Sequence, residues 1–150
     1  METVSRILTL SPSDLIAYKI QSFNTLAREG NIELSITHLS QLTSLIEQNE
    51  PKNTEFMLET AKLFSRICGC HPSILKFTLQ LVQKCRKLNP ILNEHTLELA
   101  NHHVMLKDYN TAFGLFQESA SLDESSLDSL VGMIKCRIYQ GMIDDAVRNN

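Results

Sequence analysis

A pattern near the C-terminal end of the sequence recurs after 34 residues and narrows the choice of fold. Ala112 and Ala146 stand 34 positions apart, and each follows an apolar helical segment and a short turn. A small residue near the start of a second helix lets the first helix cross it closely. The large residue four positions on, Phe116 in the first copy, lies on the same helix face and fills the space between pairs. The spacing therefore predicts antiparallel helix pairs that stack on one another.

The prolines support a chain built of helices alone. Pro12, Pro51, Pro72 and Pro90 all fall where helices are expected to begin or end, and none interrupts an apolar period. Proline is tolerated in the first turn of a helix but not in its interior. No stretch alternates apolar and polar residues as a half-buried strand does. We predict an all-α fold, a right-handed α-solenoid of tetratricopeptide-like helix pairs, with no sheet.

The chain is expected to form a single slab of a longer α-solenoid. We read residues 2–10 as the tail of a preceding helix. The second helix of the last pair is expected to begin near Met142, so the sequence ends just inside it. A solenoid that starts and stops within a motif would expose apolar faces meant for neighbours. The expected helix pairs are residues 12–50, 53–90, 93–123 and 125–150.

Residues with capping side chains stand before most of the expected helices. Asn53 is predicted to cap a helix of residues 54–67, and Asn93 and Asp108 the two helices of the following pair. Asp123 or Ser125 is expected to cap the next helix. Gly30 is expected to break the chain between the helices of the first pair, because glycine adopts the left-handed conformation readily.

Composition excludes several classes of function. The 150 residues are 43% apolar and carry a net charge of −3, which does not favour binding to nucleic acid or to an anionic membrane. Lys84, Arg86 and Lys87 form the densest basic group, at an expected helix end where cations complement the helix dipole. No apolar run is long enough for direct membrane insertion. Four cysteines in a chain of this size indicate a reducing compartment.

No residue set predicts catalysis, a cofactor or a small-molecule substrate. Cys68, Cys70, His71 and Cys85 are the nearest approach to a metal site, but they lack the paired spacing of zinc ligands, and we expect buried or turn cysteines. A metal-dependent enzyme built on these four residues stays open as an alternative. The acidic pairs 144–145 and 123–124 stand at expected helix starts, where the dipole accounts for them.

Polar residues of the first helices are the remaining candidates for partner binding. In a tetratricopeptide array the first helix of each pair lines the concave face, which places Glu94, Asn101 and Lys135 there. Adjacent His102 and His103 point to different sides of a helix, with one expected inward. An alternative function is an adaptor that binds acidic peptide tails, as chaperone-associated tetratricopeptide domains do. That function needs several cationic or amide side chains in one groove.

Five segments resemble the tetratricopeptide repeat protein 21 family, the tetratricopeptide subunit of intraflagellar transport complex A. Their order and spacing match an internal segment of that much longer protein. They are REGN (28–31), EPKNTEF (50–56), AKLFSRICG (61–69), LDESSLDSLVGMIKC (122–136) and GMIDDA (141–146).

The resemblance implies a non-catalytic scaffold. It implies a protein of the cytoplasm and cilium whose partners are other subunits of complex A. Members of the family support retrograde ciliary transport and the delivery of cargo into the cilium. The residues by themselves indicate a helical-repeat binding scaffold.

Overall fold

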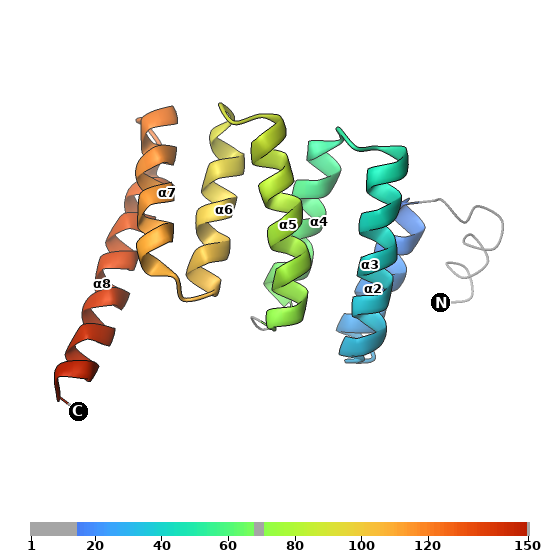
Figure 1. The fold of residues 1–150 in the computed structure, drawn as a ribbon, viewed down its shortest axis with the longest axis horizontal. Helices are drawn as coiled ribbons and strands as arrows, with labels where there is room; N and C mark the ends of the chain where they lie inside the picture. The colour runs from blue at the N-terminus through green and yellow to red at the C-terminus, as the bar shows by residue number, and fades with distance from the viewer. Residues whose placement is uncertain (1–14, 68–70, 150) are drawn as a thin grey trace. The chain divides into compact units, whose positions relative to one another are not determined.

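The structure, a computed structural model, describes residues 15–67 and 71–149. These residues form seven helices and no strand, which confirms the all-α prediction. The expected tail at residues 2–10 lies outside the described residues, as does the first proline. The helices are α2 (Leu15–Ala27), α3 (Ile32–Asn49), α4 (Thr54–Ile67), α5 (Pro72–Leu88), α6 (Asn93–Met105), α7 (Tyr109–Leu122) and α8 (Leu127–Asn149) (Figure 1).

The chain divides into two compact units, residues 1–81 and 82–150. In the first unit α2 packs against α3 and also touches α4. Gly30 separates α2 from α3 at a φ of +62°, the left-handed conformation that glycine adopts without strain. Asn31 then opens α3, because its side chain accepts a hydrogen bond from the Leu34 backbone N–H at 3.0 Å. Asn53 caps α4 in the same way, as predicted, by accepting from the Phe56 N–H at 3.1 Å.

The core of the first unit is built from one face of each helix. In α3 the fully buried positions Leu39, Leu42 and Ile46 follow a helical period. Phe64 is the largest fully buried side chain of α4, and its ring meets Phe23 of α2 edge-on, with centroids 6.4 Å apart. These contacts hold α2, α3 and α4 together through apolar burial.

The second unit packs α6, α7 and α8 around a close helix contact. Ala112 is fully buried on α7, and Phe116, one turn further on, is 2% exposed. The Phe116 ring fills the space over Gly132 of α8, where an added Cβ would lie only 2.4 Å from a ring carbon. The small and large residues expected on α7 therefore do set its packing. The partner surface is a glycine, which the sequence pattern did not identify.

A chain of buried hydroxyl groups joins the three helices of the second unit. Ser119 of α7 donates to the Asn93 side chain of α6, and its hydroxyl lies 2.7 Å from the Ser129 hydroxyl of α8. Ser129 in turn donates to Ser126 at 2.9 Å. The hydroxyls of Ser119, Ser129 and Ser126 therefore all have partners, which avoids the cost of unsatisfied polar groups at these three positions.

Two of the expected helix caps were wrong. Helix α6 begins at Asn93 itself, and its N-cap is Leu92, whose side chain makes no capping bond. The Asn93 oxygen is already engaged by Ser119. Helix α8 is capped by Ser126, which accepts from the Ser129 N–H at 3.3 Å, in place of Asp123 or Ser125. The Asp123 carboxylate accepts from the Ser125 N–H at 3.0 Å within the preceding turn.

The expected helix pair at residues 125–150 is a single helix in the structure. Helix α8 runs from Leu127 to Asn149 without a break at Gly141, and no second helix begins near Met142. Ala146, the counterpart of the buried Ala112 in the 34-residue pattern, is accordingly exposed. A glycine in an exposed helix costs about 1 kcal/mol relative to alanine, which is too little to end a helix of this length.

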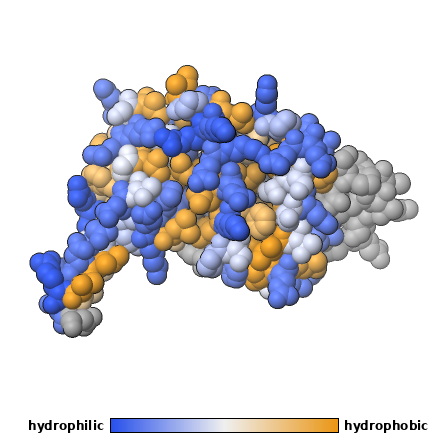
Figure 2. Space-filling view, in the orientation of Figure 1, coloured by the Kyte–Doolittle hydropathy of each residue, from blue (hydrophilic) through white to orange (hydrophobic). Residues whose placement is uncertain are grey.

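The outer face of α8 is apolar and uncovered. Leu127, Val131, Ile134, Ile138 and Met142 follow one another at intervals of three or four residues, and their exposed fractions range from 46% to 73%. Figure 2 shows apolar side chains along this helix toward its C-terminal end. We call these five residues the α8 stripe. Helix α8 thus has one face against α7 and a second apolar face opposite to it.

The turn between α6 and α7 is closed by two adjacent residues. Lys107 adopts a φ of 62°, and its N–H bonds the carbonyl of Val104. The Asp108 N–H bonds the carbonyl of His103, which completes the Schellman arrangement that ends many helices. The Asp108 side chain then caps α7 as predicted, by accepting from the Thr111 N–H at 3.3 Å.

Candidate protein-binding grooves

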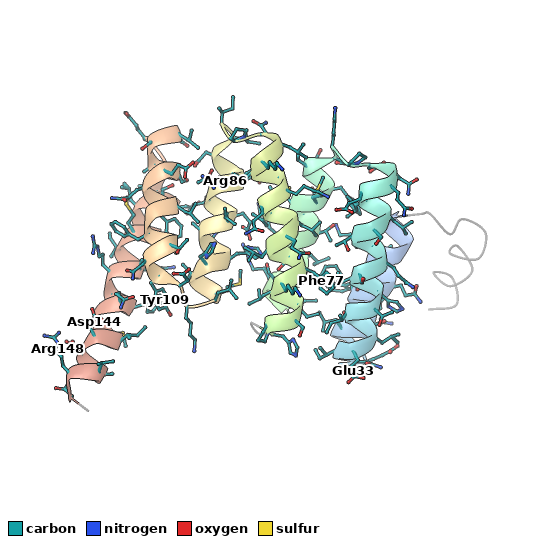
Figure 3. All side chains as sticks on the ribbon, in the orientation of Figure 1. Glu33, Phe77, Arg86, Tyr109, Asp144 and Arg148 are labelled. Atoms are coloured by element: carbon teal, nitrogen blue, oxygen red, sulfur yellow. The ribbon has the colours of Figure 1, made fainter. Side chains whose placement is uncertain are left out.

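A groove with a cavity of about 430 Å³ lies in the second unit, between the end of α5 and helices α6 and α7. Pro90, Leu99 and Leu115 form its apolar floor, and Gln83, Arg86, Lys87, His103 and Thr111 are its polar lining. We call it the α5–α7 groove. In Figure 3, Arg86 lies near the end of α5 that leads into α6. The volume suits a few side chains of a bound peptide.

An ion pair connects the two helices that flank the α5–α7 groove. One guanidinium nitrogen of Arg86 lies 2.6 Å from both carboxylate oxygens of Glu118 on α7. The two residues are 32 positions apart. Their side chains are 32% and 43% exposed, so the pair is partly hydrated. Such a pair contributes at most about 1 kcal/mol to stability, and another carboxylate could replace Glu118 at little cost.

His103 brings a third basic side chain to the same groove. Its Nδ1 lies 3.4 Å from the Asp108 carboxylate but makes no hydrogen bond. The pKa of Asp108 is lowered, chiefly by its hydrogen bond with Thr111 and additionally by the neighbouring His103. The carboxylate therefore stays ionised at neutral pH and places a negative charge beside the His103 ring.

A second groove, with a cavity of about 510 Å³, lies between α2 and α4 of the first unit. Ile20, Phe23, Phe56 and Leu63 make it mostly apolar. The Lys19 ammonium sits 4.9 Å from the centre of the Phe56 ring. Burial lowers the pKa of Lys19, and the carboxylate of Glu59 opposes that shift. This α2–α4 groove thus carries one cation and one anion that offset each other.

The buried face of α6 carries polar side chains that are shielded from solvent. His102 is fully buried with its Nδ1 3.2 Å from the Glu98 carboxylate, and its Nε2 has no hydrogen-bond partner. His95 is 1% exposed and its Nδ1 lies 3.2 Å from the Asn89 carbonyl. One of the adjacent pair His102 and His103 is therefore inward, as expected. None of these buried side chains lines the α5–α7 or the α2–α4 groove.

The comparisons with known proteins agree with this geometry. Residues 37–149 match a family model described as the second ARM domain of tetratricopeptide repeat protein 21. The chain belongs to the tetratricopeptide repeat protein 21 family. ARM and tetratricopeptide units are both stacked helical repeats, so the family and the helical structure describe one kind of fold.

Relatives in this family match almost the whole chain. Tetratricopeptide repeat protein 21B of Homo sapiens is 30% identical over 97% of the chain, and that of Xenopus laevis is 28% identical over the same share. Tetratricopeptide repeat protein 21A of Homo sapiens is 27% identical, also over 97% of the chain. The chain spans only 11–12% of the length of these relatives. It therefore corresponds to an internal segment of the family.

A solved structure shares the fold. The crystal structure of MamA protein superposes with a TM-score of 0.63 at 13% sequence identity, covering 98% of this chain and 75% of that one. At this identity the likeness concerns the fold alone. It supports the helical-repeat architecture over the full described length.

The residues predicted to bind a partner do not meet in either groove. Glu94 and Asn101 lie two turns apart on one side of α6, and Lys135 lies exposed on α8. None of the three lines the α5–α7 or the α2–α4 groove. Glu94 and Lys135 are exposed and Asn101 is partly buried. Their role in binding stays a prediction.

The cysteine cluster can be followed only in part. Cys68 and Cys70 lie outside the described residues, and His71 is partly buried at the start of α5. Cys85 is fully buried, and burial raises the pKa of its thiol to about 11. It is therefore protonated at neutral pH and is a poor nucleophile or ligand. Within the described residues no three His, Cys, Asp or Glu side chains are grouped to hold a metal ion.

The sequence pointed to the basic residues of the groove without revealing the groove. Arg86 and Lys87 were assigned to the end of a helix, where the structure does place them. Leu99, His103 and Thr111 join them through the packing of α6 and α7. The available signal was the spacing of Leu99 and His103 on α6, with Leu115 on the next helix, α7.

In the described part of the chain, no helix is long and apolar enough to cross a membrane.

Proposed function

We propose that this chain is a non-catalytic scaffold segment of a subunit of intraflagellar transport complex A. In this role it works in the cytoplasm and cilium, where the complex supports retrograde transport and cargo delivery. The family match over 97% of the chain is the observation that carries the proposal. Two surface grooves and a helical-repeat fold are also what a protein-binding scaffold requires.

The proposal includes the place of the chain in a longer protein. We infer that it is one slab of an extended α-solenoid. The α8 stripe supports this inference, because a helix in a solenoid packs against neighbours on two sides. The relatives, about nine times as long, provide further chain for such neighbours.

Isolated chains are expected to self-associate through the α8 stripe. Contiguous apolar surface of this kind drives association in water. Sedimentation velocity should show a concentration-dependent increase in mass, and Ile134→Glu should shift the chain toward monomer. Gln117→Glu on α7 adds the same charge at an exposed polar position and should leave association unchanged. If the unsubstituted 150-residue chain is monomeric at every concentration, the expected association through the α8 stripe is wrong.

Co-purification tests the assignment to complex A. The full-length parent protein, tagged and isolated from ciliated cells, should recover other subunits of the complex. Recovery of chaperones without any of those subunits would refute the proposal and favour a peptide-binding adaptor. Lys135→Glu provides a finer test of the predicted surface residues. If Lys135 faces a partner, recovery of one subunit should fall while helix content is unchanged.

The adaptor is the second candidate function, and one observation favours it. Arg86, Lys87 and His103 meet at a single groove with an apolar floor. Such convergence is what recognition of acidic peptides needs. A scaffold can include this activity, so the two candidates are compatible.

A further inference from the structure

We propose that the α5–α7 groove binds an acidic peptide segment of a protein partner, one in which a carboxylate side chain stands beside an apolar side chain. The inference rests on the proposed scaffold role, because it names the kind of partner that the scaffold would hold. The groove lies entirely within the second unit, so its geometry is that of one compact body.

The floor of the groove fits the apolar part of such a segment. Leu99 is 5% exposed and Leu115 is 8% exposed, so both are anchored in the core and offer only their outer atoms to a ligand. Pro90 extends this surface beyond the end of α5. A leucine or similar side chain set on this floor would remove apolar surface from water with little reorganisation.

The polar lining of the groove includes basic side chains and no carboxylate, although Glu118 and Asp108 lie next to Arg86 and His103 just outside it. Arg86 and Lys87 are the basic side chains of the lining, and the His103 ring joins them from α6. The chain as a whole has a net charge of −3, so this lining stands out against its surroundings. Gln83 and Thr111 add neutral groups that can bond to a peptide backbone. The lining is therefore complementary to an acidic segment of a partner.

The Arg86–Glu118 pair already demonstrates the contact that the partner would make. One guanidinium nitrogen of Arg86 lies 2.6 Å from both carboxylate oxygens of Glu118, so a carboxylate already reaches this side chain in the structure. Glu118 is not part of the groove lining, and its side chain is 43% exposed. We infer that Glu118 competes with the carboxylate of the partner for Arg86.

Other partners fit the charges less well. Nucleic acid needs a dense track of cations along its backbone, which a net-negative chain with one small basic groove does not provide. The α2–α4 groove is more apolar, and its own lining includes the Glu59 carboxylate beside Lys19, which disfavours an acidic ligand. Of the two grooves, the α5–α7 groove is therefore the one whose charges favour an acidic ligand.

Short fluorescent peptides can test the inference on the full 150-residue chain. Each peptide carries one glutamate and one leucine, and the set of peptides varies the separation between them. Analogues with glutamine in place of glutamate are the neutral controls. Fluorescence anisotropy measures binding. At least one acidic peptide should bind with a dissociation constant below about 1 mM, and its glutamine analogue should bind about tenfold more weakly. Added salt should weaken binding, because the charges are close to solvent.

Three variants give effects of different sign. Lys87→Glu should weaken peptide binding about tenfold, because it reverses a charge in the lining. Glu118→Gln should strengthen binding by about threefold, because it removes the competitor for Arg86. Lys76→Glu is the matched control: it makes the same change on α5, about 16 Å along the helix axis from Lys87, and should alter binding less than about twofold. Circular dichroism of each variant checks that helix content is unchanged.

Several results would overturn the inference. The inference is wrong if no acidic peptide binds at about 1 mM, or if the glutamine analogues bind equally well. It is also wrong if Lys87→Glu and Lys76→Glu have equal effects on binding. Binding of RNA or anionic vesicles in place of peptide would overturn it as well. Failure of these peptide experiments would refute peptide binding by the α5–α7 groove. It would not affect the proposed role in complex A. Failure to recover complex A subunits would remove the ciliary role and leave the peptide measurement intact.

Discussion

Replacing Phe64 with alanine is expected to lower the free energy of unfolding by about 3–5 kcal/mol. Phe64 is fully buried in α4 and meets the Phe23 ring edge-on at 72°. Its removal would leave a cavity in the first unit and would end a favourable aromatic contact. Urea denaturation followed by circular dichroism would measure the loss as a shift in midpoint.

Phe56 on the same helix provides the matched control. It is only partly buried and lines the α2–α4 groove, where Lys19 covers one side of its ring. Phe56→Ala should therefore cost less than half as much as Phe64→Ala. Equal losses for the two variants would contradict the placement of Phe64 at the centre of the first unit.

Gly132→Ala is expected to destabilise the second unit by about 1–3 kcal/mol. The new methyl group would lie 2.4–2.5 Å from three carbons of the Phe116 ring. Phe116 is 2% exposed, so its ring has little room to move away. The clash would outweigh the gain of up to about 1 kcal/mol that alanine normally brings to a helix. Thermal and urea unfolding of the variant would measure the change.

The same substitution elsewhere in α8 should have the opposite sign. A Cβ at Gly141 would meet no atom within 4 Å, so Gly141→Ala should stabilise the chain by about 0.5–1 kcal/mol. Coupling provides a second check: combined with Phe116→Leu, the cost of Gly132→Ala should shrink, because the smaller side chain clears the space. A Gly132→Ala variant as stable as the parent would show that α7 and α8 separate easily.

Local signals made much of the fold predictable. Asn53 and Asp108 were expected to cap helices, and each accepts the expected backbone hydrogen bond. A cap depends on a few neighbouring residues, so its sequence signature is read without knowledge of the tertiary structure. Pro51, Pro72 and Pro90 lie at or between helix ends for the same reason. Helices α4 and α5 accordingly span the ranges expected from these signals.

Tertiary contacts and helix continuity account for the predictions that failed. Asn93 has a good capping side chain, but Ser119 from the next helix occupies it. A new helix was expected to begin near Met142, after Gly141, yet α8 continues through both residues. In both cases the sequence pattern gave a local preference of about 1 kcal/mol, which packing or helix continuity overrides.

The grooves depend on where distant residues meet. Arg86 and Glu118 are 32 positions apart in the sequence and meet only in the folded second unit. The separation of 32 residues is close to the predicted repeat period, but the period does not specify which side chains face each other. The candidate partner residues were assigned from helix order alone, and that order does not locate grooves.

The double use of Asp108 limits how this chain can vary in length. Its backbone N–H closes α6 and its carboxylate opens α7, with Lys107 in the left-handed conformation just before it. An insertion or deletion between these helices would detach Asp108 from one of its two roles and shift every later residue of α7 by about 100° around the helix axis. Substitutions at Lys107 should be accepted far more readily, glycine best of all. Tags and insertions are therefore best placed elsewhere, and related sequences should vary here in residue type but not in number.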